Sequence, residues 1–78
     1  MYILRCADDS LYTGITIDVL RRVNEHNNDN TKAARYTRVR RPVKLVYQEN
    51  CHDRSAASQR EYQIKQLNRL QKLALITS

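Results

Sequence analysis

The sequence predicts an α+β domain, in which a small three-stranded antiparallel sheet is flanked by helices in the order β-β-α-β-α-α. Short runs near residues 2–6, 11–16 and 43–48 are rich in the β-branched and aromatic residues that strands favour. Segments with apolar residues at helical spacing follow the second and third runs. No repeat or low-complexity segment interrupts this order, so we expect a single domain over residues 1–78.

The first half of the chain is a predicted hairpin followed by a helix. Asp8-Asp9-Ser10 is a turn signal, so the first two runs pair as neighbouring strands. Asp18, or Thr16 before it, can cap a helix that extends to about residue 27. The asparagine-rich run that follows ends this helix, because these side chains compete for backbone hydrogen bonds.

The second half begins with residues 31–44, which we interpret as an exposed basic loop with little apolar content. The third strand comes next, and helices over about 55–67 and 69–76 complete the chain. We expect Asp53 or Ser55 to cap the first of these two helices. The residues of the last helix expected to face inward are Leu70, Leu73 and Ile76.

The charge of the chain points to a polyanionic partner. Fourteen Lys and Arg residues against eight Asp and Glu residues give a net charge of +6, which favours nucleic acid for a domain of this size. A soluble basic protein without such a partner is the alternative. Cys6 and Cys51 form no close-spaced metal motif and nothing looks secreted, so we expect a reduced, cytoplasmic protein. No stretch approaches the ~20 apolar residues of a membrane span, so we expect no membrane partner.

Glu61 is the first candidate for chemistry. On a helix it shares a face with Ala57 and Ile64, and a carboxylate among apolar neighbours costs free energy unless it is paired or binds a metal. An ion pair with Lys65 on the next turn is the structural alternative. The periodicity alone favours neither reading.

Arg22 and His26 form a second candidate, because their spacing puts them on one helix face. Arg21 has a ready partner in Glu25, whereas Arg22 is left without one. An unpaired arginine beside a histidine suits a phosphate, whose geometry matches the guanidinium. Two solvated side chains are the alternative.

Two tyrosines and a glycine are the third candidate. Tyr2 and Tyr12 would ordinarily lie at the edge of the core, which is the usual place of tyrosines in strands. Gly14 is the only glycine of the chain and lies within a strand-like run. Glycine there usually marks a bend or the close approach of another group.

The joint order of these candidates resembles the GIY-YIG nuclease superfamily over nearly the whole chain. The family pattern has two tyrosine-containing strand motifs, then an arginine and a histidine on a helix, and a metal-binding glutamate on a later helix. The matching residues here are Tyr2, Tyr12-Thr13-Gly14, Arg22, His26 and Glu61. Residues 34–38, followed by Pro42, and residues 61–67 resemble the small single-domain bacterial branch of the superfamily (UPF0213-like).

The resemblance implies a metal-dependent endonuclease that hydrolyses phosphodiester bonds of DNA, including branched or damaged DNA, with weak or structure-directed specificity. Glu61 would bind Mg²⁺ or Mn²⁺, and Tyr2 or Tyr12 would act as general base. Arg22, the metal and His26 would lower the pKa of that tyrosine. Arg22 would also stabilise charge on the phosphoryl oxygens. No small-molecule cofactor is implied.

The resemblance also implies a phosphate-binding surface that does not read sequence. Gly14 would leave room for the DNA backbone, and the basic segment would bind phosphates. The residues expected on this surface are Gly14, Lys32, Arg35, Tyr36, Arg38, Arg40 and Arg41. Asn68 is the only candidate for the asparagine that larger nucleases place beyond the glutamate.

This mechanism requires Tyr2 and Tyr12 on the same face of the sheet. An odd-length loop of residues 7–9 pairs Tyr2 with Gly14 and satisfies the requirement, whereas a shorter Asp-Asp turn puts the tyrosines on opposite faces. We therefore predict the odd-length loop.

Two other functions stay open at this point. One is a nucleic-acid-binding domain of the same fold that no longer cuts, acting on RNA or a ribosomal particle. The other is a small interaction protein with no role for these polar residues. Metal-dependent nicking separates the nuclease from the first alternative, and salt-dependent binding separates the first alternative from the second.

Overall fold

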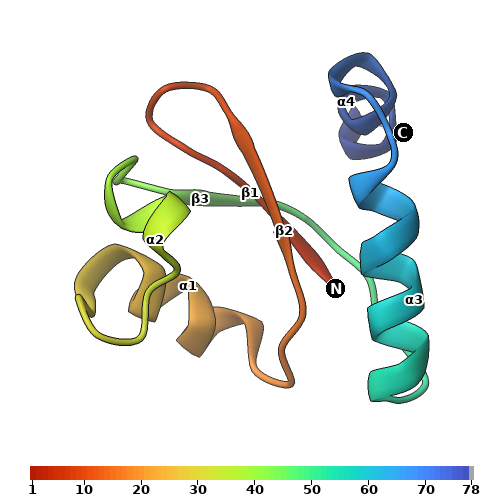
Figure 1. Ribbon diagram of the computed structural model, residues 1–78, viewed down its shortest axis with the longest axis horizontal. Coiled ribbons are helices and arrows are strands. Elements are labelled where there is room, and N and C mark those ends of the chain that lie inside the picture. Colours follow the sequence, from red (N-terminus) through yellow and green to blue (C-terminus); the bar gives the residue numbers. More distant parts are fainter. Residues whose placement is uncertain (78) are drawn as a thin grey trace.

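The computed structural model describes residues 1–77, in which a three-stranded antiparallel sheet lies between two groups of helices (Figure 1). β1 (Tyr2–Arg5) is the central strand, and β2 (Leu11–Gly14) and β3 (Lys44–Gln48) pair with it on either side. The expected α+β fold and antiparallel sheet are confirmed.

The helices cover the sheet from two sides. α1 (Val19–Asn28) and the short α2 (Arg35–Arg38) lie on one side, and α3 (Arg54–Lys65) and α4 (Arg69–Thr77) lie on the other (Figure 1). The order agrees with the prediction, with α2 as an addition to it. Within residues 1–77, no helix is long and apolar enough to cross a membrane.

The loop between β1 and β2 has the odd length that the sequence predicts. The Cys6 N–H donates to the Ser10 carbonyl at 2.9 Å, so residues 7–9 form the loop. Asp9 has a φ of 70°, the left-handed conformation that closes many hairpin loops of this length. The Asp8 carboxylate accepts a hydrogen bond from the Ser10 N–H, which supports the turn locally.

This loop sets the register of the sheet. Tyr2 pairs with Gly14 and Leu4 pairs with Tyr12, as predicted. Because side chains alternate along a strand, Tyr2 and Tyr12 share the α1 side of the sheet and Ile3 points to the α3 side.

Each face of the sheet therefore carries its own core. The buried residues on the α1 side are Tyr2, Leu4, Cys6 and Val43, and those on the α3 side are Met1, Ile3 and Ile64. Leu75 and Ile76 of α4 pack against the second core, whereas Leu70 is 78% exposed. The expectation that Leu70 faces inward is wrong, because α4 packs against this core through its C-terminal half.

The sequence also predicts where two of the helices begin. The Asp18 carboxylate accepts from the Arg21 N–H at 3.1 Å and caps α1. The Asp53 carboxylate accepts from the Ala56 N–H at 2.8 Å and caps α3. Both side chains satisfy an N–H group that has no partner inside the helix.

Residues 31–44 are not the exposed loop that their composition suggests. Ala33 and Thr37 are buried, and α2 forms the middle of the segment. Arg41 donates hydrogen bonds that satisfy the C-terminal end of α1, at 2.6 Å to His26 O, 2.8 Å to Asn30 Oδ1 and 3.1 Å to Asp29 O. The prediction failed because counting charges does not reveal which basic side chains reach carbonyl oxygens of their own chain.

Candidate active site

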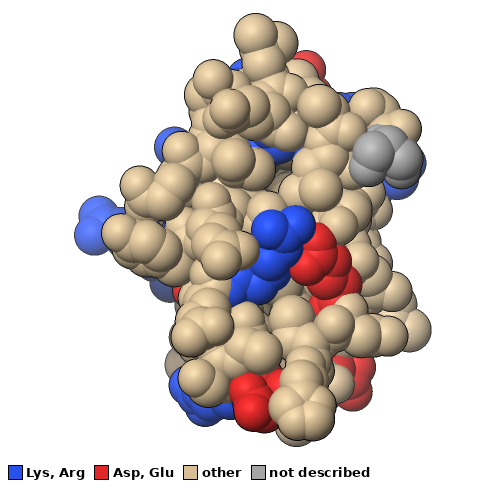
Figure 2. Space-filling view, turned by 90° about the vertical axis from the view of Figure 1, so that its right-hand side faces the viewer, with Lys and Arg blue, Asp and Glu red and all other residues tan. Residues whose placement is uncertain are grey.

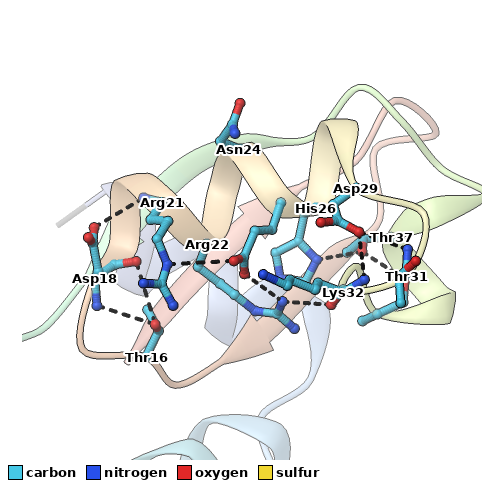
Figure 3. A network of polar contacts seen from close by, with 12 residues as sticks. Thr16, Asp18, Arg21, Arg22, Asn24, His26, Asp29, Thr31, Lys32 and Thr37 are labelled. Carbon is cyan, nitrogen blue, oxygen red and sulfur yellow. Dashed lines mark hydrogen bonds and ion pairs between the residues drawn. The ribbon is translucent and has the colours of Figure 1, made fainter.

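The centre of the site is a buried chain of hydrogen bonds from β1 through α1 to α2. Tyr2 is 1% exposed, and its hydroxyl lies 2.9 Å from His26 Nε2. His26 is completely buried, and its Nδ1 lies 2.6 Å from Thr37 Oγ1 (Figure 3). Thr37 Oγ1 in turn donates to the Ala34 carbonyl at 3.0 Å.

Tyr12 connects this buried chain to the surface. Its ring meets the His26 ring edge-on, with 5.3 Å between centroids, and stacks on the ring of Tyr36 at 5.8 Å. The Arg40 guanidinium lies 3.9 Å from the centroid of the Tyr36 ring. Tyr12 is half-buried and Tyr36 is exposed, so Tyr12 is the more accessible of the two motif tyrosines.

Gly14 gives the Tyr2 hydroxyl its space. A Cβ atom at Gly14 would lie 2.5 Å from the Tyr2 hydroxyl oxygen and 2.7 Å from Cζ. These separations are far shorter than carbon atoms tolerate, so the expected close approach at Gly14 is present in the structure.

Arg22 is held in place by its own chain. Its Nη1 donates to Glu25 Oε1 at 3.1 Å and to the Lys32 carbonyl at 2.7 Å, and Figure 3 shows the side chain extended toward Lys32. The prediction that Arg22 lacks a partner is wrong, because Glu25 pairs with both Arg21 and Arg22. Nη1 makes both contacts, and the guanidinium also interacts with the Tyr2 hydroxyl.

Glu61 approaches the tyrosines from α3. Its side chain is 25% exposed, and one carboxylate oxygen lies 3.8 Å from Lys65 Nζ, so the ion pair weighed from the sequence is present but long. Burial raises the pKa of Tyr12, the Arg22 guanidinium opposes this effect, and the Glu61 carboxylate adds to it. Arg22 and Glu61 act on Tyr2 with the same signs. Both charged groups therefore influence the tyrosines electrostatically, with Arg22 on α1 and Glu61 on α3.

Burial keeps Tyr2 and His26 neutral. It raises the pKa of Tyr2 to about 12, against a smaller lowering by Arg22. It lowers the pKa of His26 to about 4, and Arg22 lowers it further. Transfer of a proton from Tyr2 to His26 is therefore unfavourable in the free protein, because burial disfavours the charged forms of both side chains. The expectation of a tyrosine with a lowered pKa is thus not met in the free protein, because desolvation outweighs the positive charge of Arg22.

The basic residues expected to bind DNA fall into two groups. Arg41 is committed to α1, and Arg40 is committed to Asp8 Oδ2 at 3.1 Å and to the Tyr36 carbonyl at 3.0 Å. Lys32 and Arg35 are exposed, and the structure pairs neither side chain with an acidic residue within residues 1–77. Arg38 shares a property with each group, because it is exposed and also donates one hydrogen bond, to the Asn30 carbonyl.

Asn68 has a structural task instead of a place beside the tyrosines. Its Oδ1 accepts from the Gln71 N–H at 2.8 Å, and Gln71 Oε1 accepts from the Asn68 N–H at 2.9 Å. This reciprocal pair caps α4.

Thr37, by contrast, belongs to the candidate site and was missed by sequence reasoning. Its only signal was membership of the stretch 34–38, which gives no hint that its hydroxyl meets a buried histidine.

Comparisons with known proteins identify the family of the chain. The family model described as the GIY-YIG catalytic domain matches residues 1–74. A UPF0213 protein of Desulfotalea psychrophila is 59% identical over 76 residues, which cover 97% of this chain and 68% of that protein. A UPF0213 protein of Staphylococcus epidermidis is 54% identical over 97% of this chain and 90% of its own length. One of Staphylococcus saprophyticus is 49% identical over 99% of this chain and 92% of its own length. No solved structure matches. The chain belongs to the GIY-YIG family.

Proposed function

We propose that the protein is a metal-dependent DNA endonuclease that hydrolyses phosphodiester bonds with weak or structure-directed specificity. One observation carries the proposal. Residues far apart in the sequence, from two strands and two helices, contact or electrostatically influence the tyrosine pair beside Gly14. These residues are Tyr2, Tyr12, Arg22, His26 and Glu61.

Glu61 is the residue that would hold the metal. GIY-YIG nucleases generally use divalent metal ions, and a carboxylate is the oxygen ligand that Mg²⁺ and Mn²⁺ prefer. Residues 1–77 contain no group of three or more His, Cys, Asp or Glu side chains that could hold an ion. A lone carboxylate still fits Mg²⁺, which keeps several waters and commonly binds one or two carboxylates together with substrate phosphates. When bound, the ion would supply Lewis-acid stabilisation of the leaving 3′ oxygen.

Arg22 would stabilise the negative charge that develops on the phosphoryl oxygens. Glu25 and the Lys32 carbonyl hold the guanidinium before substrate binds, so little side-chain ordering remains to be done in the reaction. The same backbone contact ties Arg22 to the exposed basic residue Lys32. A phosphate bound by Lys32 would therefore lie on a segment that contacts Arg22 directly.

Tyr12 is the tyrosine that we assign to the attacking water. It is half-buried, whereas Tyr2 is fully buried and already bonded to His26. A general base must reach the proton that it abstracts, so accessibility is considered before pKa when one of the two tyrosines is assigned this role. Burial raises the pKa of Tyr12, so this role would require the positive charges of Arg22 and the metal ion to favour its phenolate form in the complex.

DNA would approach mainly over α1 and α2, and Glu61 would be the residue of α3 that it reaches. Lys32, Arg35 and Arg38 provide exposed positive charge, and the Lys32 carbonyl contacts Arg22, which suits phosphate contacts without sequence readout. Figure 2 shows the face that carries α3 and α4, where basic side chains appear singly or next to acidic ones. That face lacks the continuous positive surface that a nucleic acid backbone favours.

The test is nicking of plasmid and branched DNA with Mg²⁺ or Mn²⁺, comparing the wild type with Glu61→Ala and Glu61→Gln. Both substitutions should abolish metal-dependent cleavage. Lys65→Gln is the matched control, because it removes the partner of Glu61 at 3.8 Å and keeps the carboxylate. It should leave nicking intact. Full activity of Glu61→Gln, or loss of activity in Lys65→Gln alone, would contradict the metal-ligand role.

A second candidate is a nucleic-acid-binding domain of the same fold that does not cut. The observation that favours it is the burial of Tyr2 and the raised pKa of both tyrosines, which disfavour a phenolate base in the free protein. Salt-dependent DNA or RNA binding by a wild type that never nicks would support this candidate against the nuclease.

A further inference from the structure

We propose that Thr37 is a positioning residue, whose hydroxyl holds His26 in the Nδ1–H tautomer and thereby makes Tyr2 an acceptor for Arg22. The proposal rests on the proposed function and adds to it a residue from α2. It follows from the direction of each hydrogen bond in the buried chain described above.

The Thr37 end of the chain gives the first argument. A threonine hydroxyl has a single hydrogen, and Thr37 Oγ1 lies 3.0 Å from the Ala34 carbonyl, which can only accept. With its hydrogen directed there, Oγ1 presents a lone pair to His26 Nδ1 at 2.6 Å. Nδ1 must then carry the ring proton.

The Tyr2 end gives a second, independent argument. The Tyr2 hydroxyl is buried, and its polar neighbours are His26 Nε2 at 2.9 Å and the Arg22 guanidinium. A guanidinium has donors and no acceptor, so only Nε2 can accept the tyrosine hydrogen. The Tyr2 end therefore favours an unprotonated Nε2, the same tautomer, and Thr37 adds the acceptor for Nδ1–H that makes this tautomer the single form.

The His26 tautomer determines whether the Tyr2 hydroxyl presents its lone pairs or its hydrogen to Arg22. With Nε2 as acceptor, the Tyr2 hydrogen points into the core and the oxygen lone pairs face the guanidinium. In the opposite tautomer, Nε2–H would donate to the Tyr2 oxygen and turn the tyrosine hydrogen toward Arg22, where donor would face donor. Thr37 thus orients Arg22 through two intervening residues while staying buried itself.

The ring protonation can be read directly in the free protein. The chain has two histidines, and His52 is exposed, so it serves as an internal reference for His26 in a long-range ¹H–¹⁵N spectrum. We expect protonated Nδ1 and unprotonated Nε2 at His26 in the wild type and in Thr37→Ser, which keeps the hydroxyl. Thr37→Val has the same shape without the hydroxyl, and we expect a mixture of tautomers.

The nicking rate is the second readout on the same three proteins. Loss of one net hydrogen bond corresponds to a roughly 2- to 10-fold effect. Thr37→Val should therefore nick roughly 2- to 10-fold more slowly, and Thr37→Ser should stay within about twofold of the wild type.

The two readouts separate the possible failures. A wild-type His26 with protonated Nε2, or a Thr37→Val protein that keeps the pure Nδ1–H form, overturns the positioning role of Thr37. A wild type that shows the expected tautomer and never nicks DNA overturns the proposed function. If Thr37→Val does not fold, a Thr37→Ser protein with mixed tautomers or a loss of nicking beyond tenfold overturns the positioning role.

Discussion

Gly14→Ala should destabilise the protein by forcing Tyr2 away from His26. The new Cβ would lie 2.5 Å from the Tyr2 oxygen and 2.7 Å from Cζ. Gly14 does not have a positive φ, so alanine fits the backbone and the clash alone carries the effect. Overpacking costs roughly 1–3 kcal/mol and a buried group left unbonded adds about 1–3 kcal/mol, while the smaller entropy of the unfolded alanine chain offsets about 0.4–1 kcal/mol. The net loss should be roughly 2–4 kcal/mol, a large share of the stability of a small domain.

Urea unfolding followed by circular dichroism measures this loss as a lower midpoint with an unchanged slope. A double-mutant cycle with Tyr2→Phe isolates the share of the hydroxyl, because phenylalanine removes the oxygen at 2.5 Å and keeps Cζ at 2.7 Å. The two substitutions together should cost less than the sum of their separate costs, by about 1 kcal/mol. A Gly14→Ala protein with the wild-type midpoint would refute the close approach of Tyr2 to Gly14, and strictly additive costs would refute the share assigned to the hydroxyl.

Three further predictions concern charged residues. Arg41→Ala should lower the free energy of unfolding by about 1–3 kcal/mol, because it leaves carbonyls at the end of α1 without donors. Arg35→Ala removes the same charge and should change stability by less than about 0.5 kcal/mol; equal losses in urea titrations would show that Arg41 is not structural. Lys32→Ala and Arg35→Ala should each reduce the slope of log affinity against log salt concentration by about 0.9 on duplex DNA of any sequence. An unchanged slope would show that DNA does not contact these two residues. The Arg60 hydrogen bonds lower the pKa of Glu49 below its ordinary 4.5, so the folded state binds fewer protons than the unfolded state in acid. This stabilisation is present at neutral pH and is lost as pH falls through the lowered pKa, so Glu49→Gln should lose less stability than the wild type between pH 7 and about pH 3. Equal losses in both proteins would contradict a stabilising Glu49–Arg60 pair.

Local features of the sequence predict local features of the fold. Asp18 and Asp53 cap their helices because a short acceptor side chain satisfies the free N–H groups of a first turn, whatever the rest of the molecule does. The spacing of Tyr2, Tyr12 and Gly14 predicts the register, because alternation along a strand leaves few pairings that put both tyrosines on one face. Local sequence does not predict that Leu70 is exposed, because several faces of α4 are apolar and only packing selects the one that is buried.

The sequence by itself determined which chemical groups the candidate site contains, because the order of the tyrosines, Arg22, His26 and Glu61 resembles the GIY-YIG pattern. Only the tertiary structure decided how those groups are bonded and ionised. Burial sets the pKa of Tyr2 to about 12 and that of His26 to about 4, because desolvation depends on every element packed around them. The Thr37 hydroxyl meets His26 for the same reason, since α2 lies across α1 only when the whole domain is folded.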